Sequence, residues 1–311
     1  MLESLSENAR VESIRASNAI EGIEVDAGRV ELLAREGGSH FRSRNEREFA
    51  GYRDALDELM RKPETRSPTV GFILHLHGRL YSHTRAAGGS LKLEDNYIRD
   101  TDEHGERQVV FTPPAWRDTP FMLKELEDRY REATEREVAH PLVLVSALIL
   151  DLLAIHPVID GNGRTARLLT TSELLRQGYG VPRYVSLEQL IFESKDSYYD
   201  TLYASQQGWH DGAHSIWPWT DYLTTVLLTA YVKFESRAAD ARGTGGMNKQ
   251  ARTRHHVENF APATFRIADL RSALPGVSDP TLRLVLNQMR EEGRVEVDGV
   301  GRSAVWRRRT Q

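Results

Sequence analysis

The sequence predicts a mainly α-helical protein with two modules, and three observations lead to this prediction. Apolar residues recur at helical spacing through most of residues 1–240. The exception is residues 96–112, whose alternating pattern and turn residues are typical of a β-hairpin. Residues 243–246, Gly-Thr-Gly-Gly, predict a flexible spacer before a C-terminal module of opposite charge.

Length and composition indicate the class of protein. With 311 residues and a hydrophobic fraction of 40%, the chain is expected to form two domains with a sizeable core. It contains no cysteine, which excludes disulfides and cysteine-based zinc sites. Residues 1–15 lack the apolar run of a signal peptide, and the most apolar stretch, residues 141–155, is too short to span a bilayer. We therefore expect a cytoplasmic protein with no membrane partner.

The helical patterns of the first module follow one another along the chain. They cover residues 44–60, 72–81, 121–130, 141–155, 165–177 and 219–242. In the hairpin, residues 96–99 should pair with residues 108–111, and Pro113 and Pro114 should end it. The expected domains are an N-terminal helical region of residues 1–60, a core of residues 61–242 and a C-terminal domain of residues 243–311.

The C-terminal module is expected to fold as helix, turn, helix and hairpin. Its expected helices are residues 265–274 and 279–289, and its expected strands are residues 294–297 and 304–307. From residue 241 onward the chain has 13 Lys and Arg against 7 Asp and Glu, a net of about +6, whereas the whole chain is at −4. Two interpretations stay open: DNA binding through Arg283, Arg290 and Arg302, or a docking or dimerisation module with a solvated basic face.

The segment 156–167, His-Pro-Val-Ile-Asp-Gly-Asn-Gly-Arg-Thr-Ala-Arg, combines groups that handle phosphate. Gly161 and Gly163 can turn backbone N–H groups toward one anion where a helix begins. Arg164 and Arg167 lie one helical turn apart, so both can reach the same ligand. Taken singly, these residues are more often ordinary turns and surface charges, but together they predict a polyphosphate site.

Two further side chains in this segment supply metal and proton chemistry. Asp160 offers a hard oxygen for Mg²⁺, which proteins bind through one or two carboxylates together with phosphate. His156 titrates near neutrality and can take a proton from an attacking hydroxyl.

The segment resembles the signature of the Fic family, H-x-F-x-D/E-G-N-G-R-x-x-R, most of whose members transfer AMP from ATP to a protein hydroxyl. Every polar position of the signature is present. Val158 departs from it, because the family usually has an aromatic there that anchors the loop, and the smaller side chain leaves volume that a neighbour must fill. The resemblance implies a Fic helical core with a β-hairpin flap, plus a small C-terminal winged-helix-like α+β domain.

The same resemblance implies roles for the residues of the signature. His156 would be the general base and Asp160 the Mg²⁺ ligand. The phosphates of the ATP substrate would be held by Arg164 and Arg167, by Asn162, and by the backbone from Gly161 through Gly163 to Arg164.

The segment Ser17-Asn18-Ala19-Ile20-Glu21-Gly22 resembles the inhibitory helix S/T-x-x-x-E-G/N of many Fic proteins. Ser17 and Glu21 lie one turn apart on a helix expected over residues 10–22, and Gly22 would stop it. The resemblance implies that Glu21 pairs with Arg167, the guanidinium that should hold the γ-phosphate.

Other residues carry weaker implications of the resemblance. Tyr97 and Ile98 would face the nucleotide if the hairpin is the flap, although an ordinary surface hairpin is the alternative. Tyr198 and Tyr199 would wall the adenine and Gln206 would contact the nucleotide, although at least one of the tyrosines could be a core residue. Four histidines, His75, His77, His255 and His256, form no persuasive metal site.

The sequence therefore predicts a Mg²⁺-dependent protein adenylyltransferase that modifies a Ser, Thr or Tyr of a target protein and of itself, inhibited by Glu21. Removal of AMP by the same core, with Glu21 orienting water, is one alternative. Transfer of another phosphate-containing group is a second, and a DNA-binding regulator whose core senses nucleotide is a third. Homodimer formation is a further expectation to test.

Overall fold

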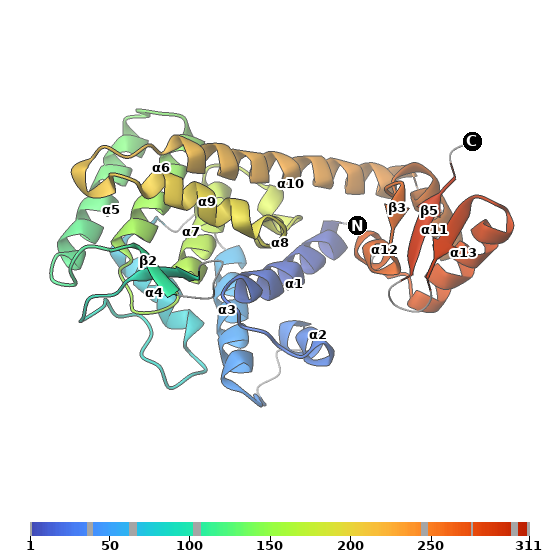
Figure 1. Cartoon of the computed structure of the whole chain (residues 1–311), viewed down its shortest axis with the longest axis horizontal. Helices are drawn as coiled ribbons and strands as arrows, with labels where there is room; N and C mark the ends of the chain where they lie inside the picture. The colour runs from blue at the N-terminus through green and yellow to red at the C-terminus, as the bar shows by residue number, and fades with distance from the viewer. Residues whose placement is uncertain are drawn as a thin grey trace. The chain divides into compact units, whose positions relative to one another are not determined.

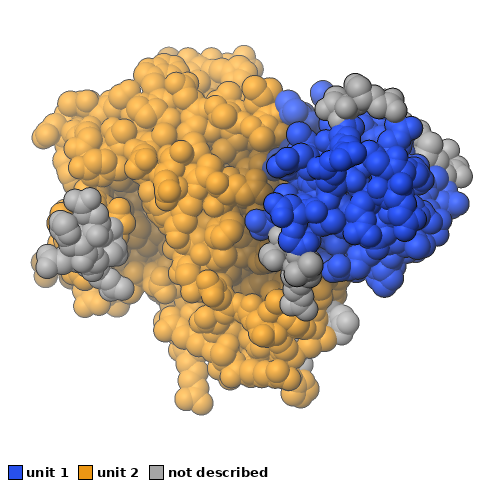
Figure 2. Space-filling model, turned by 45° about the vertical axis from the view of Figure 1, so that its right-hand side comes forward, with its two compact units in different colours: residues 1–8, 231–311 blue, residues 9–230 orange. Residues whose placement is uncertain are grey.

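The computed structural model describes residues 2–35, 40–61, 67–101, 107–243, 248–274, 276–299 and 304–309. The chain divides into two compact units (Figure 2). We call residues 9–230, unit 2 in that figure, the first unit, and residues 1–8 with 231–311, unit 1 in that figure, the second unit. The sequence predicts a boundary at the spacer of residues 243–246, whereas the compact units divide between residues 230 and 231, within the helix Trp217–Gly243. Among the described residues, no helix is both long and apolar enough to cross a membrane.

The helices up to residue 243 follow the predicted order (Figure 1). They are α1 (Leu2–Ile20), α2 (Ala27–Arg35), α3 (Arg44–Arg61), α4 (Val70–Leu80), α5 (Thr119–Glu135), α6 (Pro141–Ile155), α7 (Asn162–Arg176), α8 (Leu187–Glu193), α9 (Lys195–Gln206) and α10 (Trp217–Gly243), with 3₁₀ turns η2 (Val181–Arg183) and η3 (Trp209–Asp211). The six predicted helical segments are confirmed, with ends that shift by a few residues.

Helices α6 and α7 form the centre of the first unit. The apolar stretch predicted as a core helix is α6, whose residues from Leu148 to Leu150 are all buried. α7 is buried on every side from Arg164 to Leu175, since it packs against α3, α4 and α6. Helices α3 and α4 approach so closely that a Cβ at Gly51 would collide with the carbonyl of Leu80, which requires glycine there.

The predicted hairpin is present as β1 (Ile98–Thr101) and β2 (Arg107–Phe111), which pair antiparallel. The register shifts between Ile98 and Arg99, so the hairpin contains an irregularity near its start. The first strand begins two residues later than predicted, and the side chain of Asn96 donates hydrogen bonds to backbone carbonyls of the α6–α7 loop. The turn between the strands lies outside the described residues.

The second unit contains a small sheet packed against helices. Beyond residue 243 its elements are α11 (Lys249–Asn259), β3 (Thr264–Phe265), α12 (Ile267–Ala273), α13 (Asp279–Glu291), β4 (Val295–Asp298) and β5 (Val305–Arg308). The three strands are antiparallel in the order β3-β5-β4. The fold class is thus confirmed as mainly helical with one hairpin and a small C-terminal sheet.

The sequence prediction missed two elements of this unit. The sequence of helix α11 has little apolar periodicity, and among its residues only Thr253 and Val257 are buried. Phe265, predicted in a helix, lies in β3 opposite Trp306. A two-residue strand whose partner is some forty residues away leaves no local pattern.

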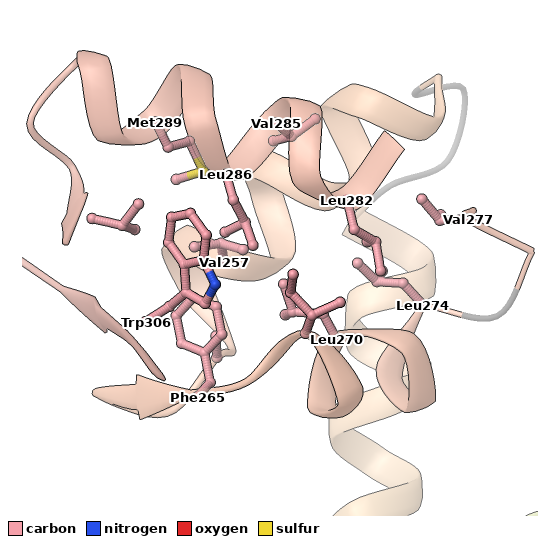
Figure 3. Packing of buried hydrophobic residues seen from close by; sticks show 13 residues of the cluster. Val257, Phe265, Leu270, Leu274, Val277, Leu282, Val285, Leu286, Met289 and Trp306 are labelled. Carbon is pink, nitrogen blue, oxygen red and sulfur yellow. The ribbon is translucent and has the colours of Figure 1, made fainter. Parts of the chain in front are cut away.

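The core of the second unit is built on the predicted inner face of α13 (Figure 3). Leu282 and Leu286 point from this helix toward Leu270 of α12 and the ring of Trp306. Gly293 has φ +72° and ends α13 as predicted. The expected wing residue Arg302 lies outside the described residues.

Candidate functional site

The loop between α6 and α7 turns sharply at both of its ends. His156 caps α6 with left-handed angles, φ +50° and ψ 59°, while its N–H donates to Leu152 O at 3.0 Å. Gly161, with φ +87°, caps the N-terminus of α7. A left-handed residue other than glycine is strained and persists only where its surroundings hold it. The first-turn N–H groups of α7 have no intrahelical acceptors, and the helix dipole favours an anion there.

The side chain of His156 is held as a neutral imidazole. Its Nδ1 lies 3.1 Å from Leu153 O, so Nδ1 carries the proton and donates it to that carbonyl. The other nitrogen, Nε2, then keeps its lone pair. Burial lowers the pKa of His156 to about 4, and the charge of Lys92 acts in the same direction, whereas Glu21 and Asp160 oppose the shift. The imidazole is therefore uncharged at neutral pH and can accept a proton.

Asn162 closes the loop on itself. Its Oδ1 accepts the Val158 N–H at 3.1 Å, and its Nδ2 donates to Val158 O at 2.7 Å. Both side chains are buried. The side-chain amide of Asn162 thus bonds the loop backbone in this structure, and the small Val158 is held by hydrogen bonds as well as by packing.

Asp160 presents its carboxylate to solvent. The side chain is 62% exposed, and its Oδ2 lies 3.7 Å from Nη2 of Arg44 on α3. Its backbone carbonyl accepts from His77 Nε2 at 3.1 Å, while His77 Nδ1 accepts the Gly89 N–H at 3.0 Å. Among the described residues no three metal-ligating side chains come together. One accessible carboxylate fits Mg²⁺ where a phosphate bound at the helix N-terminus supplies further ligands, since Mg²⁺ keeps several waters and binds proteins through one or two carboxylates.

Arg164 is turned toward α3 and α4. The side chain is buried, its Nη1 lies 2.8 Å from Glu48 Oε2, and its Nη2 donates to the Tyr81 hydroxyl at 3.0 Å. Glu48 also accepts from Arg44 Nε at 2.6 Å. The charge of Arg164 is thus balanced inside the protein in this state. The sequence prediction missed Glu48 and Tyr81, whose only local signal is a polar group on an otherwise buried helical face.

Arg167 is held by the segment predicted to be inhibitory. Its Nε donates to Ser17 Oγ at 2.9 Å, and its Nη2 donates to Ser17 O at 2.9 Å and to Glu21 Oε1 at 2.8 Å. Its Nη1 is buried without a hydrogen-bond partner and would lie 3.2 Å from a Cβ at Gly163. An unsatisfied guanidinium N–H beside the first turn of α7 is where a phosphate oxygen would fit.

The helix that carries Ser17 is longer than predicted. Helix α1 begins at Leu2 instead of near residue 10, and it ends at Ile20, so Glu21 follows its last turn. Gly22 has φ +72°, and the Ile23 N–H bonds Asn18 O at 2.9 Å, which closes the helix end.

The weaker candidates lie in different surroundings. Tyr198 is buried, with ring centroids 5.7 Å from Trp219 and 6.0 Å from Tyr222, and its side chain also interacts with Arg167. Tyr199 is 41% exposed and packs edge-on against Tyr198 at 5.1 Å, and Gln206 is buried at the end of α9.

On the hairpin, Tyr97 is half exposed and its ring lies 5.8 Å from the guanidinium of Arg99, while Ile98 is partly exposed at the start of β1. Among the described residues, no hydrogen bond, ion pair or ring contact joins either side chain to the α6–α7 loop. Of the unassigned histidines, His75 pairs with Glu58 at 2.7 Å, and His255 is adjacent to His256 on α11.

Part of the chain is similar to a known protein family and to several named proteins. The Fic/DOC family profile matches residues 67–174. "Protein adenylyltransferase Fic" of Nematostella vectensis is 29% identical over 208 residues, which cover 64% of this chain and 44% of that protein. The protein of the same name from Drosophila melanogaster is 28% identical over 141 residues, which cover 45% of this chain and 25% of that protein. The chain thus spans less than half the length of these two relatives.

Two solved structures resemble the chain. A Fic domain containing signaling protein from Bacteroides thetaiotaomicron has a TM-score of 0.62 and 24% identity, covering 74% of this chain and 86% of that one. A Fic family protein from Desulfovibrio desulfuricans has a TM-score of 0.60 and 22% identity, covering 98% of this chain and 88% of that one. At these identities the likeness shows the fold alone. The fold and the family match agree: residues 67–174 form a Fic/DOC family domain, and the chain is distantly homologous to the protein adenylyltransferases named Fic.

Proposed function

We propose that this protein transfers AMP from Mg²⁺-bound ATP to a hydroxyl of a target protein and of itself, and that Glu21 inhibits the transfer. The observation that carries the proposal is the arrangement of Arg167. One of its nitrogens binds Glu21, and another, without a partner, faces Gly163 at the start of α7. A guanidinium and a helix N-terminus that converge on one point suit a polyphosphate.

The residues of the loop supply the proton chemistry of this reaction. Nε2 of His156 takes the proton of the acceptor hydroxyl as its oxygen attacks the α-phosphorus, and pyrophosphate leaves. The hydrogen bond from Nδ1 to Leu153 O keeps the ring in the tautomer that this step needs. Mg²⁺ held by Asp160 would neutralise charge on the phosphates.

Inhibition follows from competition for one guanidinium. Glu21 Oε1 fills the space at Gly163 that Nη1 of Arg167 faces, so a γ-phosphate can reach Arg167 only by displacing this carboxylate. A γ-phosphate bound elsewhere would leave the α-phosphate out of line for attack. Ser17 would remain bonded to Arg167 in either state, so it orients the guanidinium.

The experiment is intact mass spectrometry of the full chain after incubation with Mg²⁺ and ATP. We expect the Glu21→Gly chain to gain the mass of one adenylyl group, and wild type and Glu24→Gly, the matched control, to gain far less. A gain of one phosphoryl group would instead indicate kinase activity. Loss of AMP from a previously modified chain only when Glu21 is present would favour the removal reaction.

For the second unit we propose duplex DNA as a partner. Arg283 and Arg290 are exposed on α13 and lie two turns apart on the same side of the helix, beside its buried face. They lie in the part of the chain with a net charge of about +6, although Arg254 and Arg271 in that part are paired with Glu292 and Asp279. Two exposed arginines on one helix suit phosphate contacts in a groove.

A further inference from the structure

Four consecutive carbonyls of the α6–α7 loop are bound by one short segment ahead of the hairpin. The Lys92 N–H donates to Pro157 O at 2.9 Å, and Lys92 Nζ donates to Ile155 O at 3.3 Å. Asn96 Nδ2 donates to His156 O at 3.2 Å and to Val158 O at 3.0 Å. The loop that carries the base is therefore held along its backbone by residues at least 60 positions earlier in the chain.

Lys92 is buried to an unusual degree for a lysine. It is 1% exposed, and its ammonium donates to three oxygens: Asn96 Oδ1 at 2.9 Å, Pro114 O at 2.9 Å and Ile155 O at 3.3 Å. These three acceptors match its three N–H bonds, and all of them are uncharged. Burial lowers the pKa of Lys92, and Asp95 partly opposes this. Burying a cation costs free energy, so the presence of a lysine at this buried position calls for an explanation.

We propose that Lys92 and Asn96 are positioning residues for His156, which hold its left-handed backbone and stabilise a loop that carries valine at position 158. The inference rests on the proposed role of His156 as the base. A strained φ of +50° needs external support, and the bonds to the carbonyls of residues 155–158 supply it on both sides of the strained residue. Without them the carbonyls of residues 155–157 would lose these partners, while Val158 O would keep only Asn162, and the peptides that follow His156 could rotate.

The charge of Lys92 has a second consequence for the base. Burial is the largest cause of the lowered pKa of His156, and Lys92 adds to it. The charged groups that act on the imidazole in the opposite sense are Glu21, which follows α1, and Asp160 in the loop. Lys92 therefore favours the uncharged imidazole that a base requires.

The test compares Lys92→Met, Asn96→Leu and the exposed control Lys124→Met in the Glu21→Gly chain, at saturating target or by self-modification. We expect the first two to lower kcat by about 10- to 100-fold, the effect of a misplaced catalytic group, while KM for ATP changes less than about threefold. Lys92→Arg, which keeps the cation and its donors, should retain more of kcat than Lys92→Met. Lys124→Met should match its parent.

A second measurement does not depend on activity. NMR titration of the His156 imidazole, identified by its absence in His156→Ala, should show a pKa that rises by about 0.5 to 1 unit in Lys92→Met, as expected when a nearby like charge is removed. Asn96→Leu keeps that charge, so its His156 pKa should rise less. Unchanged kcat and unchanged His156 pKa in folded Lys92→Met overturn the proposal. If no chain transfers AMP, the proposed function fails, and the titration alone decides whether Lys92 acts on His156.

Discussion

A Cβ atom at Gly163 would collide with Glu21 Oε1, so these two residues meet directly at the first turn of α7. The carboxylate of Glu21 therefore lies where an anion would approach the helix N-terminus, and it does so while bound to Arg167. Both contacts occupy the space that a phosphate group would need to reach the first turn of α7.

Gly163→Ala should impair ATP use even when Glu21 is absent. In the Glu21→Gly chain the new methyl group would still stand 3.2 Å from Arg167 Nη1 and would keep phosphate from the first-turn N–H groups. Loss of one hydrogen bond to a charged group, worth roughly 1.5–3 kcal/mol, predicts a rise of about tenfold or more in KM for ATP. The control is Gly71→Ala, a helical glycine whose added Cβ meets nothing closer than 3.9 Å. Equal KM values for the two variants would refute a phosphate site at Gly163.

His156→Ala should abolish transfer and leave ATP binding nearly unchanged. The imidazole acts on the acceptor hydroxyl, and general base catalysis contributes about 10²- to 10⁴-fold. Calorimetry with ATP and incorporation of labelled AMP measure the two quantities separately. His75→Ala, at an exposed histidine paired with Glu58, is the matched control. Transfer at the parent rate by His156→Ala would exclude it as the base.

The rate of transfer should stay insensitive to acid down to about pH 5. The pKa of His156 is lowered by burial to about 4, so the imidazole is still the free base where an exposed histidine would be half protonated. Removing Glu21, which raises this pKa, shifts the midpoint further in the same direction. The profile of kcat against pH for Glu21→Gly measures it, and a midpoint near 6.5 would contradict the assignment.

The same pKa predicts how stability depends on pH. Between pH 6.5 and 4 the unfolded chain binds a proton at His156 that the folded chain does not, so stability falls as the pH falls through this window. A shift of this size corresponds to roughly 3 kcal/mol at most. Urea unfolding at pH 7 and pH 4.5 should therefore show a larger loss for wild type than for His156→Gln. Identical losses would mean that His156 titrates normally in the folded chain.

The full chain should bind duplex DNA in a salt-dependent way if α13 contacts phosphates. Arg283→Ala with Arg290→Ala should weaken binding and reduce the slope of log affinity against log salt by about 2, one unit for each lost phosphate contact. Arg271→Ala, which removes an arginine already paired with Asp279, is the control. No mobility shift with any duplex at low salt would favour a docking or dimerisation module.

The central features of the site could be predicted from the sequence, because they depend on local spacing. The glycines around Asn162 imply a tight turn into a helix, and the apolar run before His156 implies a buried helix. The spacing of Ser17 and Glu21 places them on one face, and both contact Arg167.

The supporting contacts could not be predicted in this way. Lys92 and Asn96 occur in a polar stretch with no periodicity. Their partners are backbone carbonyls, which every residue has, so the sequence does not indicate which of them accept these bonds. From the sequence alone Glu48 would be expected as an exposed charge on α3, but it is buried against Arg164. The sequence could not decide between core and site for Tyr198, which packs against Trp219 and Tyr222 and also interacts with Arg167.

Incorporation of labelled AMP by wild type, Glu21→Gly, Arg167→Ala and the double variant tests the central claim most directly. Glu21→Gly removes a charge-assisted hydrogen bond worth roughly 1.5–3 kcal/mol, which predicts a rise in self-modification of about tenfold or more. The double variant should lose that gain, because the guanidinium to be released no longer exists. If Glu21→Gly incorporates no more AMP than wild type, or if the gain persists without Arg167, inhibition by competition for Arg167 is wrong.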